Sequence, residues 1–188
     1  MPRRAVPGIF CLEGPWSSRL TDQASVKPLL ELLEEHKQVR FLHWRINSVT
    51  DLESTVTKWP QRQYARYPLG YFGFHGTPGR LLIGRRAVTL DAFGDALAGQ
   101  CTGKTIYFGS CAVLGIKPAE VEAFRRRTKA RCVIGFKEAD VDWMVSAAFD
   151  LMLFDALTHY QRMDAVERYM RRNSPRVVKD LGFRMFYG

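Results

Sequence analysis

Along the chain, short continuous runs of hydrophobic residues alternate with segments in which hydrophobic residues recur at helical spacing. Leu69–His75 is apolar at successive positions, which is typical of a strand buried on both faces of a parallel sheet. In Val26–His36 the apolar side chains recur at helical spacing instead, with glutamates on the opposite face. Short apolar runs and helical segments alternate in this way through the chain, and this rhythm predicts an α/β protein.

The boundaries follow from the ends of these patterns. We expect strands at Gly8–Glu13, Val39–Ile46, Leu69–His75, Lys104–Ser110, Arg131–Phe136 and Phe183–Tyr187, and a small hairpin over Gly79–Leu90. Helices are expected over Val26–His36, from a cap at Thr50-Asp51 to Trp59, over Asp91–Ala98, from Pro118 to Lys129, over Trp143–Tyr160 and over Asp164–Arg172. The prediction is a three-layer α/β/α fold with a mainly parallel sheet of roughly six strands. No repeat or linker divides residues 1–188, so we expect a single domain.

The segment Trp143–Tyr160 differs from the other predicted helices. Ser146, Asp150, Asp155 and His159 form a narrow polar stripe on an otherwise apolar cylinder. A helix that is hydrophobic on most sides is usually buried. We therefore expect this helix to pack closely against the sheet.

Composition narrows the class of protein. The chain has 188 residues, of which 46% are hydrophobic and 25% charged, as in ordinary globular domains. The apolar stretches are too often interrupted for a membrane span, and the one after Arg3-Arg4 is too short for a signal peptide. We expect a cytoplasmic protein without a membrane partner.

The four cysteines are Cys11, Cys101, Cys111 and Cys132. None belongs to a CxxC pair, and no histidine stands at metal-ligand spacing from any of them, so neither a metal nor a cofactor is expected. Cys11 and Cys132 lie in apolar runs, which favours buried structural thiols.

Two strands end in residues that are capable of chemistry. YFGFHG places His75-Gly76 after the third predicted strand, and YFGSCA places Cys111 after the fourth. Parallel sheets bind ligands beyond the carboxyl ends of their strands, and consecutive strands are often neighbours. We therefore expect His75 and Cys111 to lie side by side.

This pair suits nucleophilic catalysis. A thiol is mostly protonated at neutral pH, and a nearby imidazole helps to form the thiolate and then protonates a leaving amine. The backbone N–H groups of Gly76 and Cys111 are candidates for holding an oxyanion.

With these two motifs, the chain resembles the caspase-like superfamily, which includes caspases, metacaspases, separases, gingipains and bacterial CHAT domains. That superfamily places its catalytic histidine in a His-Gly after the third strand and its cysteine after the fourth. The stretch VIGFKEADVDWMVSAAFDLMLFDAL also resembles the CHAT-type pattern. The resemblance implies a cysteine endopeptidase with a His75–Cys111 dyad. FGSCAVLG departs from the QAC-type sequence of caspases, so the aspartate specificity of animal caspases is not carried over to this chain. Without an obvious prodomain or processing linker, a compact prokaryotic-type member is expected.

The resemblance also indicates where a substrate side chain would bind. In that superfamily the loops after the first and fifth strands form the first specificity pocket. Here those loops contain Glu13, Glu138, Asp140 and Asp142, beside Trp143. Acidic groups favour an Arg or Lys side chain before the scissile bond. The expected partners are a protein or peptide substrate, an activating partner, and a second copy that pairs through Phe183–Tyr187. By analogy with the superfamily, the protein would be an effector in a stress or defence pathway.

Two other functions stay open. One is a catalytically silent scaffold of the same fold that binds a partner. The other is a nucleic-acid-binding domain, because the net charge is +9 and aromatic residues lie among basic ones near the C-terminus. A surface helix followed by an edge strand explains the basic segment more simply. The residues concerned are Arg162, Arg168, Arg171, Arg172, Arg176, Lys179 and Arg184, with Tyr169, Phe183, Phe186 and Tyr187.

Overall fold

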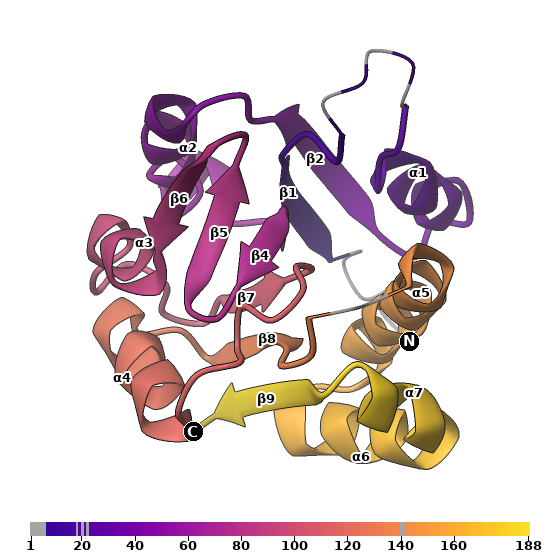
Figure 1. Ribbon diagram of the computed structural model, residues 1–188. Coiled ribbons are helices and arrows are strands. Elements are labelled where there is room, and N and C mark those ends of the chain that lie inside the picture. The colour runs from indigo at the N-terminus through magenta and orange to yellow at the C-terminus, as the bar shows by residue number, and fades with distance from the viewer. Residues whose placement is uncertain (1–6, 18, 20, 22, 140–141) are drawn as a thin grey trace.

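A six-stranded sheet forms the centre of the molecule in the computed structural model, which describes residues 7–17, 19, 21, 23–139 and 142–188 (Figure 1). The strand order is β2-β1-β3-β7-β8-β9. The first five strands in this order are parallel, and β9 runs antiparallel to β8. The strands are β1 (Gly8–Glu13), β2 (Arg40–Arg45), β3 (Leu69–Gly73), β7 (Thr105–Phe108), β8 (Cys132–Phe136) and β9 (Phe183–Tyr187).

Helices cover both faces of this sheet. One face packs against α1 (Lys27–Glu35), α5 (Trp143–His159), α6 (Met163–Asn173) and α7 (Pro175–Asp180). The other packs against α2 (Val49–Val56), α3 (Leu90–Ala96) and α4 (Pro118–Thr128). A short 3-10 helix, η1 (Arg62–Tyr64), precedes β3. The three-layer α/β/α architecture with a mostly parallel sheet is therefore confirmed.

The strand sequences explain the two cores. In β1, Ile9 and Cys11 face the α1 and α5 side, while Phe10 and Leu12 face the α2 and α3 side, and all four are buried. Because successive side chains of a strand point to opposite faces, a strand covered on both sides has to be apolar at every position. At about 25 cal/mol for each Å² of buried apolar surface, these two cores are the main stabilising contribution to the fold.

A second, smaller sheet lies over the α2 and α3 side. It consists of β4 (His75–Thr77), β5 (Arg80–Ile83) and β6 (Arg86–Thr89), all antiparallel. The predicted hairpin is thus part of a three-stranded sheet. The third predicted strand, Leu69–His75, ends two residues earlier than expected: β3 ends at Gly73, and His75, which follows it, begins β4.

The helix ends show one further correction. Ser48, not Thr50, caps α2, because its hydroxyl accepts a hydrogen bond from the Asp51 amide at 3.1 Å. The short helix α7 was not predicted. Among the described residues, no helix is both long and apolar enough to span a bilayer.

Candidate active site

The segments that follow β3 and β7 meet at the carboxyl edge of the sheet. β3 and β7 are parallel neighbours, with Phe72 opposite Phe108. The buried hydroxyl of Ser110 joins the two segments: it donates to the Phe72 carbonyl at 3.1 Å and accepts from the Phe74 amide at 3.0 Å. This link lies one residue before both His75 and Cys111 and places the two residues next to each other.

Gly76 allows the two segments to touch. A Cβ atom at this position would lie 2.4 Å from the carbonyl oxygen of Cys111 and 2.4 Å from a methyl group of Val113. No side chain fits in this space, so glycine is required for the close approach of β4 to the Cys111 turn. Cys111 is half-buried in that turn, and its backbone N–H has no hydrogen-bond partner among the described residues.

The imidazole of His75 is held in one orientation. Its Nε2 lies 2.7 Å from the carbonyl oxygen of Trp16, in the loop after β1. A carbonyl oxygen only accepts hydrogen bonds, so Nε2 must carry the proton. In the neutral imidazole the lone pair is therefore on Nδ1. The Trp16 ring also packs edge-on against the His75 ring, with centroids 5.4 Å apart.

A buried carboxylate anchors Trp16. Glu13 has no exposed surface, and its two oxygens accept hydrogen bonds from the Trp16 indole, the Ser25 hydroxyl at 2.7 Å, the Val26 amide at 2.8 Å and His43 at 2.6 Å. Burial acts to raise the pKa of Glu13, but the hydrogen bonds from His43, Ser25, Trp16 and Val26 outweigh it and lower that pKa. Glu13 stays ionised and fixes the loop that orients His75.

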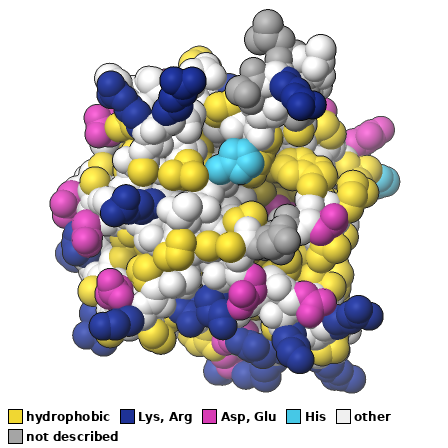
Figure 2. All heavy atoms as spheres, in the orientation of Figure 1, with side chains coloured by type: hydrophobic (Ala, Val, Ile, Leu, Met, Phe, Trp, Pro, Cys, Tyr) yellow, Lys and Arg dark blue, Asp and Glu magenta, His cyan; other side chains and the backbone are white. Residues whose placement is uncertain are grey.

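His75 and Cys111 line one cavity of about 450 Å³ between the sheet, the start of α1 and α5. This size suits a ligand or a substrate side chain. In Figure 2, hydrophobic side chains lie beside a histidine near the middle of the face, while Lys and Arg gather along the lower edge. The lining residues are Trp16, Ala24, Ser25, Val26, Pro28, Leu29, Tyr71, His75, Gly109, Cys111, Phe136, Trp143, Ser146, Ala147 and Asp150.

Asp150 of α5 is the one carboxylate among the described residues that line this cavity. It is 2% exposed and accepts hydrogen bonds from the hydroxyl groups of Tyr71, at 2.6 Å, and Tyr107. Burial raises the pKa of Asp150 to about 7, although the two tyrosine hydrogen bonds act in the opposite direction.

The residues predicted to bind substrate have different positions. Trp143 lines the cavity and packs edge-on against Trp16, with ring centroids 5.1 Å apart. Asp142 caps α5 by accepting a hydrogen bond from the Val145 amide at 2.9 Å. Glu13 is buried with donors on both oxygens and does not line the cavity. Asp140 lies outside the described residues. The structure brings together His75, Cys111 and Trp143, while Glu13 and Asp142 stabilise the adjoining loops.

The other three cysteines are buried, whereas Cys111 is partly accessible. Burial raises the pKa of Cys11 and raises the pKa values of Cys101 and Cys132 to about 12. These thiols stay protonated and unreactive. In the part of the chain that the structure describes, no group of three His, Cys, Asp or Glu side chains is placed to hold a metal ion.

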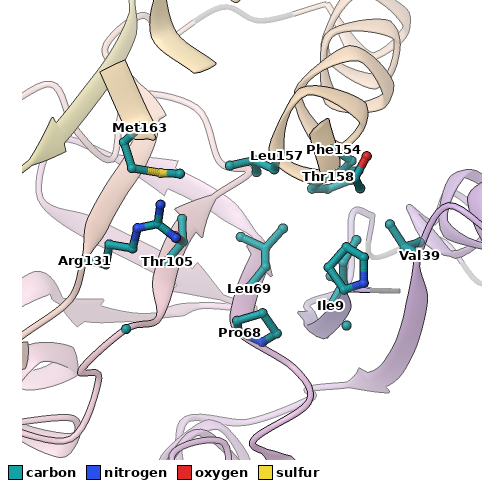
Figure 3. Close-up of a pocket in the computed structure, with 13 residues that line it drawn as sticks. Ile9, Val39, Pro68, Leu69, Thr105, Arg131, Phe154, Leu157, Thr158 and Met163 are labelled. Atoms are coloured by element: carbon teal, nitrogen blue, oxygen red, sulfur yellow. The ribbon is translucent and has the colours of Figure 1, made fainter. Parts of the chain in front are cut away.

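A second cavity, of about 70 Å³, lies at the opposite edge of the sheet, where the strands begin (Figure 3). Ile9, Leu69 and Thr105 from the starts of β1, β3 and β7 line it, together with apolar side chains of α5 and α6. No cysteine or histidine is among the described residues that line it.

Some of the arginines in the basic C-terminal segment pair with neighbouring carboxylates. Arg162 and Arg168 both pair with Asp164, and Arg171 pairs with Glu167. The aromatic residues of this segment pack against the core: Phe183 is 4% exposed, and the others are partly buried.

Three contributors to the site were not identified from the sequence. Trp16 acts through its backbone carbonyl, which no side-chain pattern reports. Ser110 was noted beside Cys111 but without a role. For Asp150 a signal was present, since an acidic residue on an apolar helix needs a buried partner or a ligand. Of the predicted polar stripe, Ser146 and Asp150 line the cavity.

These features define a three-layer α/β protein in which a histidine and a cysteine line one cavity at the carboxyl edge of a mostly parallel sheet. The chain belongs to the family described as "Family of unknown function (DUF6642)", whose profile matches residues 7–187. No curated protein matches the chain.

Proposed function

We propose that this protein is a cysteine endopeptidase of the caspase-like superfamily in which Cys111 is the nucleophile and His75 the acid/base. The order of the parts supports this proposal. His75-Gly76 follows the third strand of the main sheet, and Cys111 follows the fourth, as the resemblance of the sequence implies. Both residues line the same cavity.

The hydrogen bond between His75 Nε2 and the Trp16 carbonyl is the observation on which the proposal chiefly rests. Here the bond keeps the proton on Nε2 and leaves Nδ1 as the base, on a ring that lines the same cavity as Cys111. In this tautomer Nδ1 carries the lone pair that would accept the thiol proton.

Acylation follows from this geometry. Nδ1 of His75 takes the proton of the Cys111 thiol, and the thiolate sulfur attacks the scissile carbonyl carbon. The carbonyl oxygen becomes an oxyanion that accepts hydrogen bonds from the backbone N–H groups of Gly76 and Cys111. The C–N bond then breaks, and Nδ1–H of His75 gives its proton to the departing amine.

Deacylation repeats the same steps with water. His75 takes a proton from a water molecule, and the resulting hydroxide attacks the thioester carbon. The C–S bond breaks, the acid product leaves, and the proton on Nδ1 returns to Cys111. The Trp16 carbonyl keeps the same nitrogen available in both halves of the cycle.

Cleavage of fluorogenic peptides tests this proposal. We expect the protein to cleave at least one peptide of a panel ending in Arg, Lys, Asp or Leu. Cys111→Ala and His75→Ala should each lower kcat by about 10³-fold or more, since both groups act as a unit. His36→Ala removes an exposed histidine outside the cavity and serves as the matched control. Full activity in Cys111→Ala would refute the assignment of the nucleophile.

Labelling by a thiol-directed electrophile gives an independent measurement. We expect fast modification of one cysteine, which is lost in Cys111→Ser and slowed in His75→Ala, because the other three thiols are buried. Rapid labelling together with no cleavage of any peptide would favour the catalytically silent scaffold. Equal labelling of wild type and Cys111→Ser would contradict both.

A further inference from the structure

The Asp150 carboxylate is buried without a compensating cation. Its two partners, the hydroxyl groups of Tyr71 and Tyr107, are neutral donors. No lysine or arginine is present among the described residues that line the cavity. A buried carboxylate is costly unless it is paired, and a buried charge retained in a cavity usually marks a functional site.

Each carboxylate oxygen of Asp150 accepts only one hydrogen bond from a tyrosine, so each retains a second acceptor position. Asp150 and Ser146 lie one helical turn apart on α5, and both line the cavity. Asp150 therefore lines the cavity with acceptor positions that its two tyrosine partners do not fill.

The sheet register fixes the depth of this carboxylate. Tyr71 and Tyr107 are paired across β3 and β7, with ring centroids 5.1 Å apart. Tyr71 lies two residues before the end of β3, and Tyr107 lies one residue before the end of β7, which is roughly 3–7 Å at the usual rise of a strand. Gly109 makes room for this arrangement, because a Cβ there would lie 2.4 Å from the Tyr71 ring. Asp150 therefore lies below the strand ends that carry the His75 and Cys111 segments, and a long side chain suits this position better than a short one.

The upper wall of the cavity is aromatic. Trp16 and Trp143 pack against each other and line the cavity together with His75. Aromatic faces stabilise both an aliphatic stem and a cationic head group. An aromatic wall above an acidic floor matches the chemistry of arginine and lysine side chains.

We propose that Asp150, held by Tyr71 and Tyr107, is the floor of a substrate subsite that binds the cationic side chain of an arginine or lysine residue. As a statement about substrate, this inference rests on the proposed peptidase function. As a statement about binding, it does not require catalysis. It also replaces the loop acids Glu13, Asp140 and Asp142 with a residue of the long helix as the determinant of specificity.

Binding of small probes tests the subsite without any turnover. Benzamidine carries a planar cation similar to a guanidinium group, and benzamide is its neutral counterpart. We expect benzamidine to bind Cys111→Ala at least about 10-fold more tightly than benzamide, measured by calorimetry, because the cation pairs with a buried carboxylate. Asp150→Asn in the same background should remove this difference, and Asp155→Asn, a partly exposed position on the same helix outside the cavity lining, should keep it.

Peptide cleavage then tests the substrate class. Citrulline has the shape of arginine without its charge. We expect wild-type kcat/KM to favour an Arg peptide over its citrulline analogue by about 100-fold, and Asp150→Asn to abolish the preference through KM. The circular dichroism spectrum of Asp150→Asn establishes whether it folds. If Asp150→Asn does not fold, the comparison of benzamidine with benzamide on Cys111→Ala still tests the cationic subsite, because that variant keeps Asp150.

The outcomes separate the two proposals. Cleavage of peptides with equal rates for Arg and citrulline, and equal binding of both probes, would overturn the cationic subsite and leave the peptidase standing. Preferential binding of benzamidine that depends on Asp150, with no cleavage of any peptide, would support the subsite and refute the peptidase.

Discussion

Two side chains acquire their chemistry from a small number of contacts. His75 is given its tautomer by one backbone carbonyl, that of Trp16. Asp150 is given an unusual pKa by burial, which the hydrogen bonds from Tyr71 and Tyr107 only partly offset. In both cases the sequence neighbours of the residue contribute nothing, and the decisive atoms come from other elements of the fold.

The charge of Asp150 leads to a prediction about pH. Burial raises its pKa to about 7, so the carboxyl is ionised above that value and neutral below it. We expect the ratio of kcat/KM for Arg and citrulline peptides to fall on the order of ten-fold between pH 8 and pH 5.5, since kcat/KM follows the ionisation of the free enzyme.

The ratio of kcat/KM for the Arg and citrulline peptides reports the ionisation of Asp150 separately from that of the other titratable groups around the cavity. Burial raises the pKa values of Tyr71, Tyr107 and Cys11, so these groups stay protonated throughout the range. His75 and Cys111 affect both peptides equally and cancel. A ratio that stays constant from pH 5.5 to pH 8 would mean that Asp150 does not contact the substrate.

At the scale of elements, the site depends on how the ends of β3 and β7 are joined. Ser110 bonds to both sides of Gly73 through the Phe72 carbonyl and the Phe74 amide, and Gly76 then lies directly on Cys111. The two sheets of the molecule meet at this joint, because the chain leaves the main sheet after Gly73 and begins the small sheet at His75.

We expect Ser110→Ala to loosen this joint. The substitution leaves the buried Phe74 amide without its hydrogen-bond acceptor, which costs about 1–3 kcal/mol in the free energy of unfolding. It should also lower kcat more than it raises KM, because His75 is displaced relative to Cys111 while the cavity is retained. Urea denaturation and peptide kinetics measure both effects. Ser54→Ala, on the exposed face of α2, is the control, and a loss of stability with unchanged kcat would contradict a positioning role.

At the scale of the whole molecule, one buried carboxylate connects the sheet edge to the site. Glu13 at the end of β1 accepts hydrogen bonds from His43 of β2, from Ser25 and Val26 before α1, and from Trp16, which in turn contacts Trp143 of α5. Glu13 therefore links the end of β1 to β2, to the start of α1 and, through Trp16, to α5.

We expect Glu13→Gln to reduce the free energy of unfolding by about 1–3 kcal/mol at pH 7, because an amide replaces an oxygen that accepts hydrogen bonds. The lowered pKa of Glu13 contributes stability above the ordinary glutamate pKa of about 4.3, and this contribution is lost as the pH falls below it. The difference between wild type and variant should therefore narrow in acid, as measured by urea midpoints at several pH values. Glu31→Gln, in an exposed pair with Lys27, is the control. A constant difference at all pH values would exclude ionised Glu13 as the cause.

The architecture was predictable because it depends on patterns that are local in the chain. Leu69–Gly73 is apolar at every position, which is sufficient to indicate a strand covered on both faces. Asp142 before the apolar run of α5 marks the start of a helix. His75 and Cys111 were found for the same reason, since each directly follows such a strand and parallel strands end at one edge.

The remaining parts of the site depend on contacts between residues far apart in the chain. Glu13 was expected in a substrate pocket, but its position at the end of β1 brings His43, Ser25 and Trp16 around it. In the sequence Asp150 is only one member of a polar stripe. In the fold, the register of β3 and β7 places Tyr71 and Tyr107 where their hydroxyl groups donate to it. Hydrophobic period and chain order determine which elements form and in what sequence they follow. Only the packed fold decides which polar groups are paired and which one, the Asp150 carboxylate, lines a cavity without a cationic partner among the described lining residues.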